Sequence, residues 1–153
     1  MKRSAGLLLY RIRAGALEAL LVHPGGPLWA KKDLGAWSIP KGEYDESEQP
    51  LAAAQREFSE ETGWSSPPPF LSLGTIKQRG GKLVTAWAFE GDGDPATLVS
   101  NTFEMQWPPR SGRSQTFPEA DRAAWFDPGQ ARKKILESQA GFIDELERLL
   151  AGA

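Results

Sequence analysis

The segment from Gly42 to Trp64 concentrates carboxylate groups on a stretch that has the composition of a helix. Residues 51–62 are rich in Ala and Glu, which favour helices, and Ser47 is expected to cap the helix just before them. At about 100° per residue, three glutamates fall on one face of this helix and the apolar side chains on another. The three glutamates are Glu57, Glu60 and Glu61. Side chains of this type and spacing could hold a divalent cation.

A carboxylate face can also be no more than the hydrated side of a helix, which is the usual place for such residues. Two features weigh against that interpretation. Like charges three and four residues apart repel each other, and Glu60 and Glu61 lie near the C-terminal end of the helix, where the macrodipole disfavours negative charge. A hard cation such as Mg²⁺ prefers oxygen ligands and would turn this repulsion into binding. The helical geometry alone leaves both interpretations open.

The whole segment resembles the Nudix box, the signature of a family of pyrophosphohydrolases that cleave a nucleoside diphosphate linked to another group X. The signature asks for a glycine, a glutamate, an Arg-Glu pair, a Glu-Glu pair and a closing glycine, with apolar residues at two places. Every place is filled, by Gly42, Glu48, Arg56, Glu57, Phe58, Glu60, Glu61, Gly63 and Trp64. The resemblance implies an α/β domain with the Nudix fold, a mixed β-sheet sandwiched between α-helices, over residues 1–153.

The resemblance also implies a role for each place in the box. Mg²⁺, or in some members Mn²⁺, would be bound by the carboxylates of Glu57, Glu60 and Glu61 and by the backbone carbonyl of Gly42. Three further residues would support the box: Arg56 would pair with Glu48, and Gly63 would end the helix in the left-handed conformation. Divalent cations suit the reaction because they screen the phosphates and activate water, whereas carboxylates alone would repel the substrate.

The general base is left open, because family members take it from the box helix or from a later loop. Glu60 is the first choice within the box, and Glu57 is counted with it among the catalytic residues. Glu119 stands just before the last predicted strand, where several members place a further carboxylate near the metal ions. Its ordinary alternative is a loop residue, and Glu104, the third candidate, is more typical of the exposed face of a strand.

Substrate contacts are expected from cations and aromatic side chains outside the box. Lys41 directly precedes the box glycine and is the best placed to contact phosphate. Arg79 and Arg110 are further phosphate candidates, although surface arginines are usually only solvated. Trp107 and Trp29, beside Pro-rich and Gly-rich loops, could stack on a nucleobase. His23, the single histidine, is expected to make a local hydrogen bond rather than to bind a metal ion.

Composition limits the class of protein. The chain has 153 residues, 40% of them hydrophobic, which suits one globular domain. Its formal charge of −2 offers no general field for a nucleic-acid backbone, so extended nucleic acid is not expected as a partner. No apolar run is long enough to span a membrane, and the absence of cysteine is compatible with a reducing compartment, so a cytoplasmic protein is expected. A homodimer is left open.

The elements that must position these residues can be read from periodicity and turn signals. Strands are predicted over 4–13 and 17–24, on either side of Gly80–Gly81, and over 101–107 and 123–126; residues 65–69 and 108–121 are predicted as connectors, and helices follow Asp127. The box helix would lie between the first strands and the Gly80–Gly81 hairpin.

These observations favour a metal-dependent hydrolase of a small nucleotide, most directly a nucleoside triphosphate, as in a bacterial subgroup that the sequence resembles. A dinucleoside polyphosphate such as diadenosine polyphosphate is the alternative substrate. A non-catalytic nucleotide-sensing module is the alternative from another class, but such modules usually lack one or more of the box glutamates, and this chain keeps them all.

Overall fold

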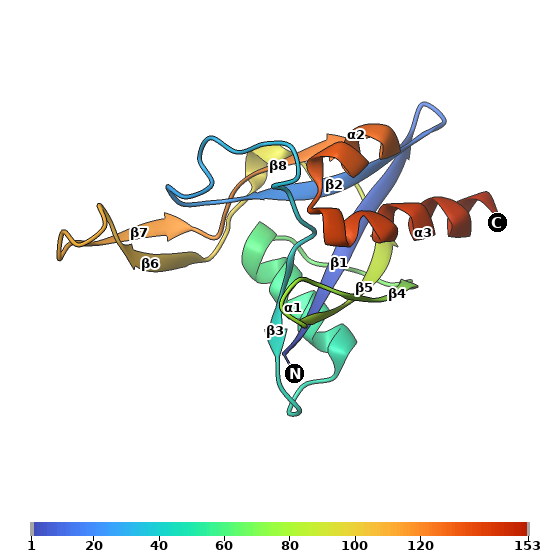
Figure 1. Ribbon diagram of the computed structural model, residues 1–153. Coiled ribbons are helices and arrows are strands. Elements are labelled where there is room, and N and C mark those ends of the chain that lie inside the picture. Colours follow the sequence, from blue (N-terminus) through green and yellow to red (C-terminus); the bar gives the residue numbers. More distant parts are fainter. Residues whose placement is uncertain (1, 153) are drawn as a thin grey trace.

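The computed structural model describes residues 2–152, and the centre of the fold is a six-stranded mixed sheet (Figure 1). The order is β4-β5-β1-β2-β8, and β3 pairs with the first part of β1. Strands β1 and β5 run parallel, whereas the other pairs in this sheet are antiparallel. The strands of the sheet are β1 (Arg3–Arg13), β2 (Ala16–Pro24), β3 (Lys41–Tyr44), β4 (Leu71–Lys77), β5 (Leu83–Glu90) and β8 (Ala120–Phe126).

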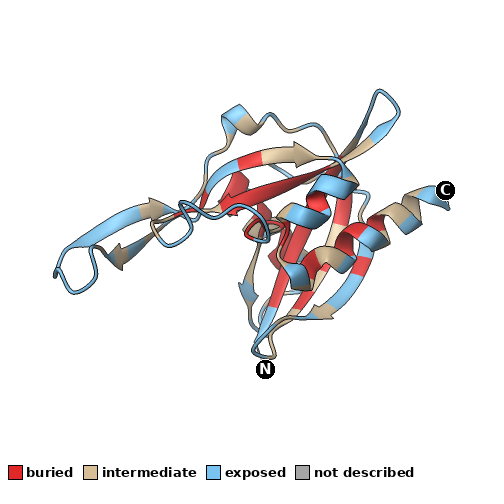
Figure 2. Cartoon of the chain, turned by 45° about the horizontal axis from the view of Figure 1, so that its top comes forward, coloured by how far each residue is buried: buried red, intermediate tan, exposed pale blue. Residues whose placement is uncertain are grey.

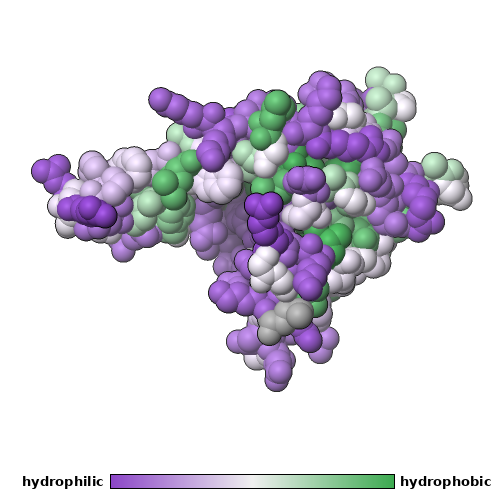
Figure 3. Space-filling view, in the orientation of Figure 1, coloured by the Kyte–Doolittle hydropathy of each residue, from purple (hydrophilic) through white to green (hydrophobic). Residues whose placement is uncertain are grey.

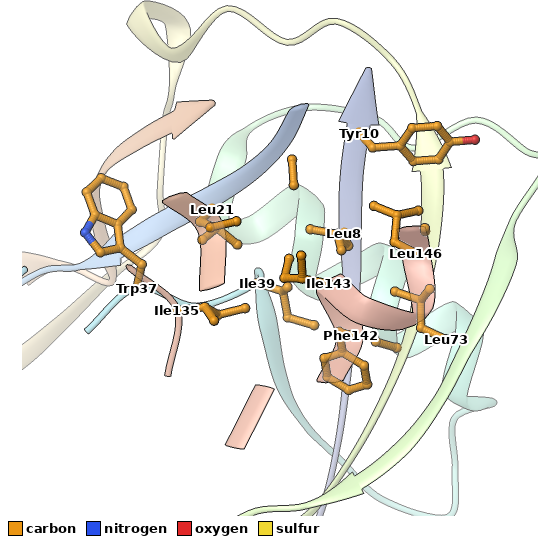
Figure 4. Packing of buried hydrophobic residues seen from close by; sticks show 14 of the residues in the cluster. Leu8, Tyr10, Leu21, Trp37, Ile39, Leu73, Ile135, Phe142, Ile143 and Leu146 are labelled. Atoms are coloured by element: carbon orange, nitrogen blue, oxygen red, sulfur yellow. The ribbon is translucent and has the colours of Figure 1, made fainter. Parts of the chain in front are cut away.

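Helices cover both faces of this sheet, because β1 is apolar on both of its sides. Its odd-numbered residues Ala5, Leu7 and Leu9 pack with α1 (Pro50–Thr62). Its even-numbered residues Leu8 and Tyr10 pack with α3 (Ala140–Ala151), as Figure 4 shows. Successive side chains of a strand point to opposite faces, so one strand serves two cores. Figure 2 shows the buried residues along the centre of the sheet. The predicted mixed sheet between helices is confirmed.

The remaining elements connect these layers. They are the short helix α2 (Pro128–Lys134), the 3₁₀ turns η1 (Pro95–Thr97) and η2 (Glu137–Gln139), and the two-stranded sheet of β6 (Thr102–Gln106) and β7 (Ser114–Pro118). No helix within residues 2–152 is long and apolar enough to cross a membrane.

The start of α1 differs from the prediction. The helix begins at Pro50, and its N-cap is Gln49, which makes no side-chain capping bond. Ser47 lies too far upstream to cap it, and its hydroxyl and backbone N–H donate instead to the carboxylate of Asp45. Proline at the first helical position needs no hydrogen-bond acceptor and has its φ already set, which explains why the helix starts there. The C-terminal end is as predicted: Gly63 is left-handed, with φ 80°, and its N–H donates to the Ser59 carbonyl at 2.8 Å.

The predicted polar connector over residues 108–121 is also partly wrong, because it contains the strand β7. This strand pairs with β6 to form a hairpin that projects from the body of the molecule (Figure 1). Phe117 lies opposite Phe103 in the register, and the two rings are 6.0 Å apart between centroids. A single apolar residue among polar neighbours gives no alternating pattern, so β7 depends on its partner strand rather than on its own composition.

Candidate functional site

The carboxylate face of α1 is turned toward β3 rather than toward solvent. Glu57 lies directly over Gly42, so closely that a Cβ atom added at Gly42 would overlap its carboxylate. The Glu57 side chain is only 14% exposed. Burial raises its pKa, an effect opposed by the neighbouring Arg56. The glycine of the box is therefore required by the close approach of the helix, and β3 and α1 together place the first carboxylate.

Glu61 is the most buried carboxylate of the site. Its residue is 8% exposed, and its Oε2 accepts a hydrogen bond of 3.1 Å from the backbone N–H of Lys41. Burial, together with the negative charges of Glu57 and Glu119, raises the pKa of Glu61 to about 8. Glu61 is thus influenced by carboxylates from two segments, since Glu57 lies on α1 and Glu119 is the residue between β7 and β8.

Arg56 holds the outer side of the same cluster. Its Nε and Nη2 donate to the two oxygens of Glu48 at 2.8 Å each, and its Nη1 donates to Glu57 at 2.8 Å and to Glu60 at 2.9 Å. These hydrogen bonds, with Glu48 first, raise the pKa of Arg56. The bidentate pair joins the loop before α1 to the helix, because the planar fork of arginine matches a carboxylate.

The donor set fits a hard divalent cation. Glu57, Glu60 and Glu61 supply carboxylate oxygens on one helix face, and Glu57 lies over the backbone of Gly42. Burial first, and then the charges of neighbouring carboxylates, raise the pKa of Glu57 and Glu61, and a bound Mg²⁺ would favour their ionised forms. Within residues 2–152, no three acidic or histidine side chains are already gathered as a cage for one ion. Binding would therefore require small rotamer changes of carboxylates now bonded to Arg56.

Lys41 and a cavity of about 220 Å³ lie on the inner side of the cluster. The cavity is lined by Lys41, by the carboxylates Glu61 and Glu119, by Trp29 and by mainly apolar residues from the sheet and its loops. Burial, followed by the positive charge of Lys82, lowers the pKa of Lys41. A cation kept near carboxylates in this way could neutralise the phosphates of a substrate.

A second cavity of about 360 Å³ continues the first toward the β6–β7 hairpin. It shares Pro24, Trp29 and Glu119 with the first cavity, and Leu28, Phe103 and Met105 complete its walls. Figure 3 shows hydrophobic side chains where the hairpin meets the body of the molecule. The two cavities adjoin along these shared residues, and we call them together the Trp29–Glu119 cleft; the first also contains Glu61 and Lys41, and the second contains the apolar side chains.

Three predicted substrate contacts lie outside this cleft. Arg79 is exposed in the turn between β4 and β5, and Trp107 and Arg110 are in the turn of the β6–β7 hairpin. The apolar wall formed by Leu28, Phe103 and Met105 was not predicted as a site. The signal for it was the alternation of Phe103 and Met105 with polar residues. This alternation predicts that one face of the strand is apolar, but it does not predict which segment of the chain lies opposite that face.

Substitution of Gly42 by Ala should test the contact between β3 and α1. The added methyl group would displace the flexible Glu57 carboxylate rather than backbone, so stability should change by less than about 1 kcal/mol while kcat falls about 10- to 100-fold. Enzyme assays and thermal unfolding would measure the two effects. Gly141→Ala is the matched control, because a Cβ atom there meets open space. An active Gly42→Ala variant would show that the position of Glu57 is unimportant.

Comparisons with known proteins agree with the box and the sheet. The family model described as NUDIX domain matches residues 2–146. An RNA pyrophosphohydrolase of Agrobacterium fabrum is 29% identical over 100 residues, covering 56% of this chain and 55% of the relative. An RNA pyrophosphohydrolase of Rhizobium meliloti is 31% identical over 104 residues, covering 58% and 57%. The chain thus spans about half the length of these curated relatives.

Among solved structures, an Ap4A hydrolase of C. elegans in a binary complex superposes with a TM-score of 0.68. It is 23% identical and covers 98% of this chain and 99% of its own. At this identity the likeness extends to the fold, and it includes the mixed sheet described above.

Proposed function

The chain belongs to the NUDIX family, and on that premise we propose that it hydrolyses a phosphoanhydride bond of a nucleoside polyphosphate with the help of Mg²⁺ or Mn²⁺. The observation that carries the proposal is the Trp29–Glu119 cleft, in which a cavity that contains carboxylates adjoins a cavity with an apolar wall. A nucleotide has the same division, with a flat apolar base at one end and an anionic chain at the other. The base would lie against Trp29 and the phosphates beside Lys41 and Glu61.

Each residue near the carboxylate end has a distinct task in this proposal. Glu57, Glu60 and Glu61 would hold the metal ion, which when bound supplies charge neutralisation of the phosphates and a more acidic water. Lys41 would contact phosphate oxygens that the carboxylates would otherwise repel. Glu119 borders both cavities and is exposed, so it can reach a water molecule beside the phosphates and accept its proton. Glu60 is the other candidate for this base.

A triphosphorylated RNA 5′ end is a second candidate substrate. It is favoured by the curated relatives, which are RNA pyrophosphohydrolases. An RNA 5′ end presents the same base and phosphates as a nucleoside triphosphate, so the Trp29–Glu119 cleft could hold its first nucleotide. The rest of an RNA chain would need a path along the surface, which the formal charge of −2 does not favour.

A product-resolved hydrolysis panel would separate these substrates. It would contain ordinary and oxidised nucleoside triphosphates, diadenosine tetraphosphate, ADP-ribose, NADH and a 5′-triphosphorylated RNA oligonucleotide, each with Mg²⁺, with Mn²⁺ and with EDTA. Metal-dependent cleavage of nucleoside triphosphates above the others supports the proposal. Preferred cleavage of the RNA or of the dinucleotide would assign the substrate accordingly. Binding without cleavage of any compound would indicate a nucleotide-sensing module.

Replacing Trp29 with Ala should raise KM for nucleotide substrates about tenfold with little change in kcat, because stacking on an aromatic ring contributes about 1–3 kcal/mol per base. Trp29 is 36% exposed, so the folded state should lose little stability. Steady-state kinetics would measure KM and kcat. Trp107→Ala is the informative comparison: if it raises KM and Trp29→Ala does not, the base stacks at the hairpin turn and the cleft has been assigned wrongly.

A further inference from the structure

His23 is fully buried at the end of β2, and both of its ring nitrogens are bonded. Nδ1 lies 2.9 Å from Oδ1 of Asp121, and Nε2 lies 2.6 Å from the backbone carbonyl oxygen of Lys32. The ring also meets Trp37 edge-on, with centroids 5.2 Å apart. His23 makes hydrogen bonds as predicted, but they are not local, because the two partners lie 9 and 98 residues away along the chain. His23 itself does not line the Trp29–Glu119 cleft.

The bond from Nε2 leads to Trp29, on one side of the cleft. Lys32, whose carbonyl accepts from Nε2, donates its own N–H to the Trp29 carbonyl at 3.0 Å. Its ammonium group lies 5.6 Å from the centroid of the Trp29 ring. The loop that carries Trp29 is otherwise exposed from residue 28 to residue 35. A buried imidazole therefore ties this loop to the sheet one turn away from the indole.

The bond from Nδ1 leads to Glu119, on the other side of the cleft. The register of β2 and β8 shifts between His23 and Pro24, which pair with Arg122 and Ala120, so Asp121 is the extra residue of a β-bulge. Bulges commonly redirect a side chain, and here the Asp121 carboxylate is directed to His23. Glu119 lies two residues before Asp121, and its carbonyl accepts from the Gly25 N–H at 2.9 Å. The bulge thus fixes the segment from which Glu119 projects.

We infer that His23 is a positioning residue that sets the distance between Trp29 and Glu119, which line both cavities of the cleft. A carbonyl and a carboxylate are both acceptors, so the two bonds are satisfied together only when both ring nitrogens donate. The Asp121 carboxylate that faces Nδ1 also lies 3.9 Å from Arg122. The consequence for catalysis rests on the proposed function, whereas the link between the two walls does not.

The structural part of the inference can be tested by NMR without any substrate. Because the chain has a single histidine, its two imidazole ¹⁵N signals are assigned without ambiguity. Both nitrogens should be protonated and protected from exchange in the folded protein. The Asp121 side chain is partly exposed, so Asp121→Ala should leave the fold intact. In this variant the Trp29 indole and Glu119 amide signals should both shift. A ring nitrogen without a proton, or a shift confined to the Glu119 side, would overturn the link.

The kinetic part compares three variants in the assay that the wild-type protein supports. Gln carries both of its N–H donors on one nitrogen, so in His23→Gln the side chain cannot bridge the two acceptors as the ring does. This variant should raise KM at least about fivefold with kcat within about twofold of the wild type, and Asp121→Ala should do the same. Asp144→Asn, which removes a surface carboxylate from an ion pair with Arg132, is the control and should behave like the wild type. Unchanged KM in both His23→Gln and Asp121→Ala would overturn the inference.

Failure of the proposed function gives a different result from failure of this inference. If the wild type cleaves no nucleotide, the proposed function fails, and the NMR measurement still decides whether His23 joins the two walls. If the wild type is active and the NMR shifts appear but KM stays constant, the two walls are linked without setting substrate affinity, and His23 is not a positioning residue. If His23→Gln does not fold, Asp121→Ala decides the question.

Discussion

Replacing Glu57 with Gln is expected to lower kcat in Mg²⁺ by about 10²- to 10⁴-fold, the range associated with losing a metal ligand or a proton-transfer group. The amide has nearly the shape of the carboxylate, so it can still lie over Gly42 and accept a hydrogen bond from Arg56. What it lacks is the negative charge that binds a hard cation. Because burial opposes ionisation of Glu57, the folded protein should not lose stability through this change.

Three measurements would check this result together. Initial rates give kcat, calorimetric titration with Mg²⁺ gives metal affinity, and thermal unfolding in EDTA shows whether the fold is intact. Glu46→Gln is the matched control, since Glu46 is exposed in the loop before α1 and lies outside the cleft. A Glu57→Gln variant with the rate and Mg²⁺ affinity of the wild type would mean that the metal ion is held elsewhere or is not used.

The sequence predicted the box well because its parts are local. The helical spacing of Glu57, Glu60 and Glu61 follows from 3.6 residues per turn, and the left-handed Gly63 follows from the stop that the prolines after it impose. Both need only the neighbouring residues. Even here the exact start of the helix depended on a choice between two local signals, and Pro50 prevailed over the capping group of Ser47.

The cleft could not be predicted in the same way, since its walls come from distant segments. Phe103 and Met105 face Trp29 only because β6 and β7 pair and turn toward the loop after β2. The joint action of His23 on two walls depends on a register shift between β2 and β8, which no residue pattern encodes. The burial of Glu61 likewise depends on contact with the Lys41 backbone, although helical periodicity had grouped Glu61 with the less buried Glu57 and Glu60.

Stability without divalent metal should fall as pH rises from about 5 to about 8, owing mainly to Glu61. Its pKa is about 8 in the folded protein and is 4.5 when unperturbed, so in this window the folded state keeps a proton that the unfolded state has lost. Stability is then fully present below the unfolded pKa and is lost as pH approaches the folded pKa. At 1.36 kcal/mol per pKa unit, the loss is on the order of 4 kcal/mol. The lowered pKa values of Asp45 and Glu48 act in the opposite sense but below this window.

Glu61→Gln isolates this effect, because the amide has no proton to lose. Urea unfolding in EDTA between pH 5 and pH 9 should show the decline in the wild type and a much flatter profile in the variant, which should be the more stable protein at pH 8. Mg²⁺ binds the ionised carboxylate, so it should stabilise the wild type more at pH 9 than at pH 6, and metal-dependent activity should rise over the same range. Parallel pH profiles in the two proteins would refute the assignment. If the profiles differ as expected, Glu61 is the site residue that most weakens the metal-free fold, and it is also the one that makes the cleft responsive to a metal ion.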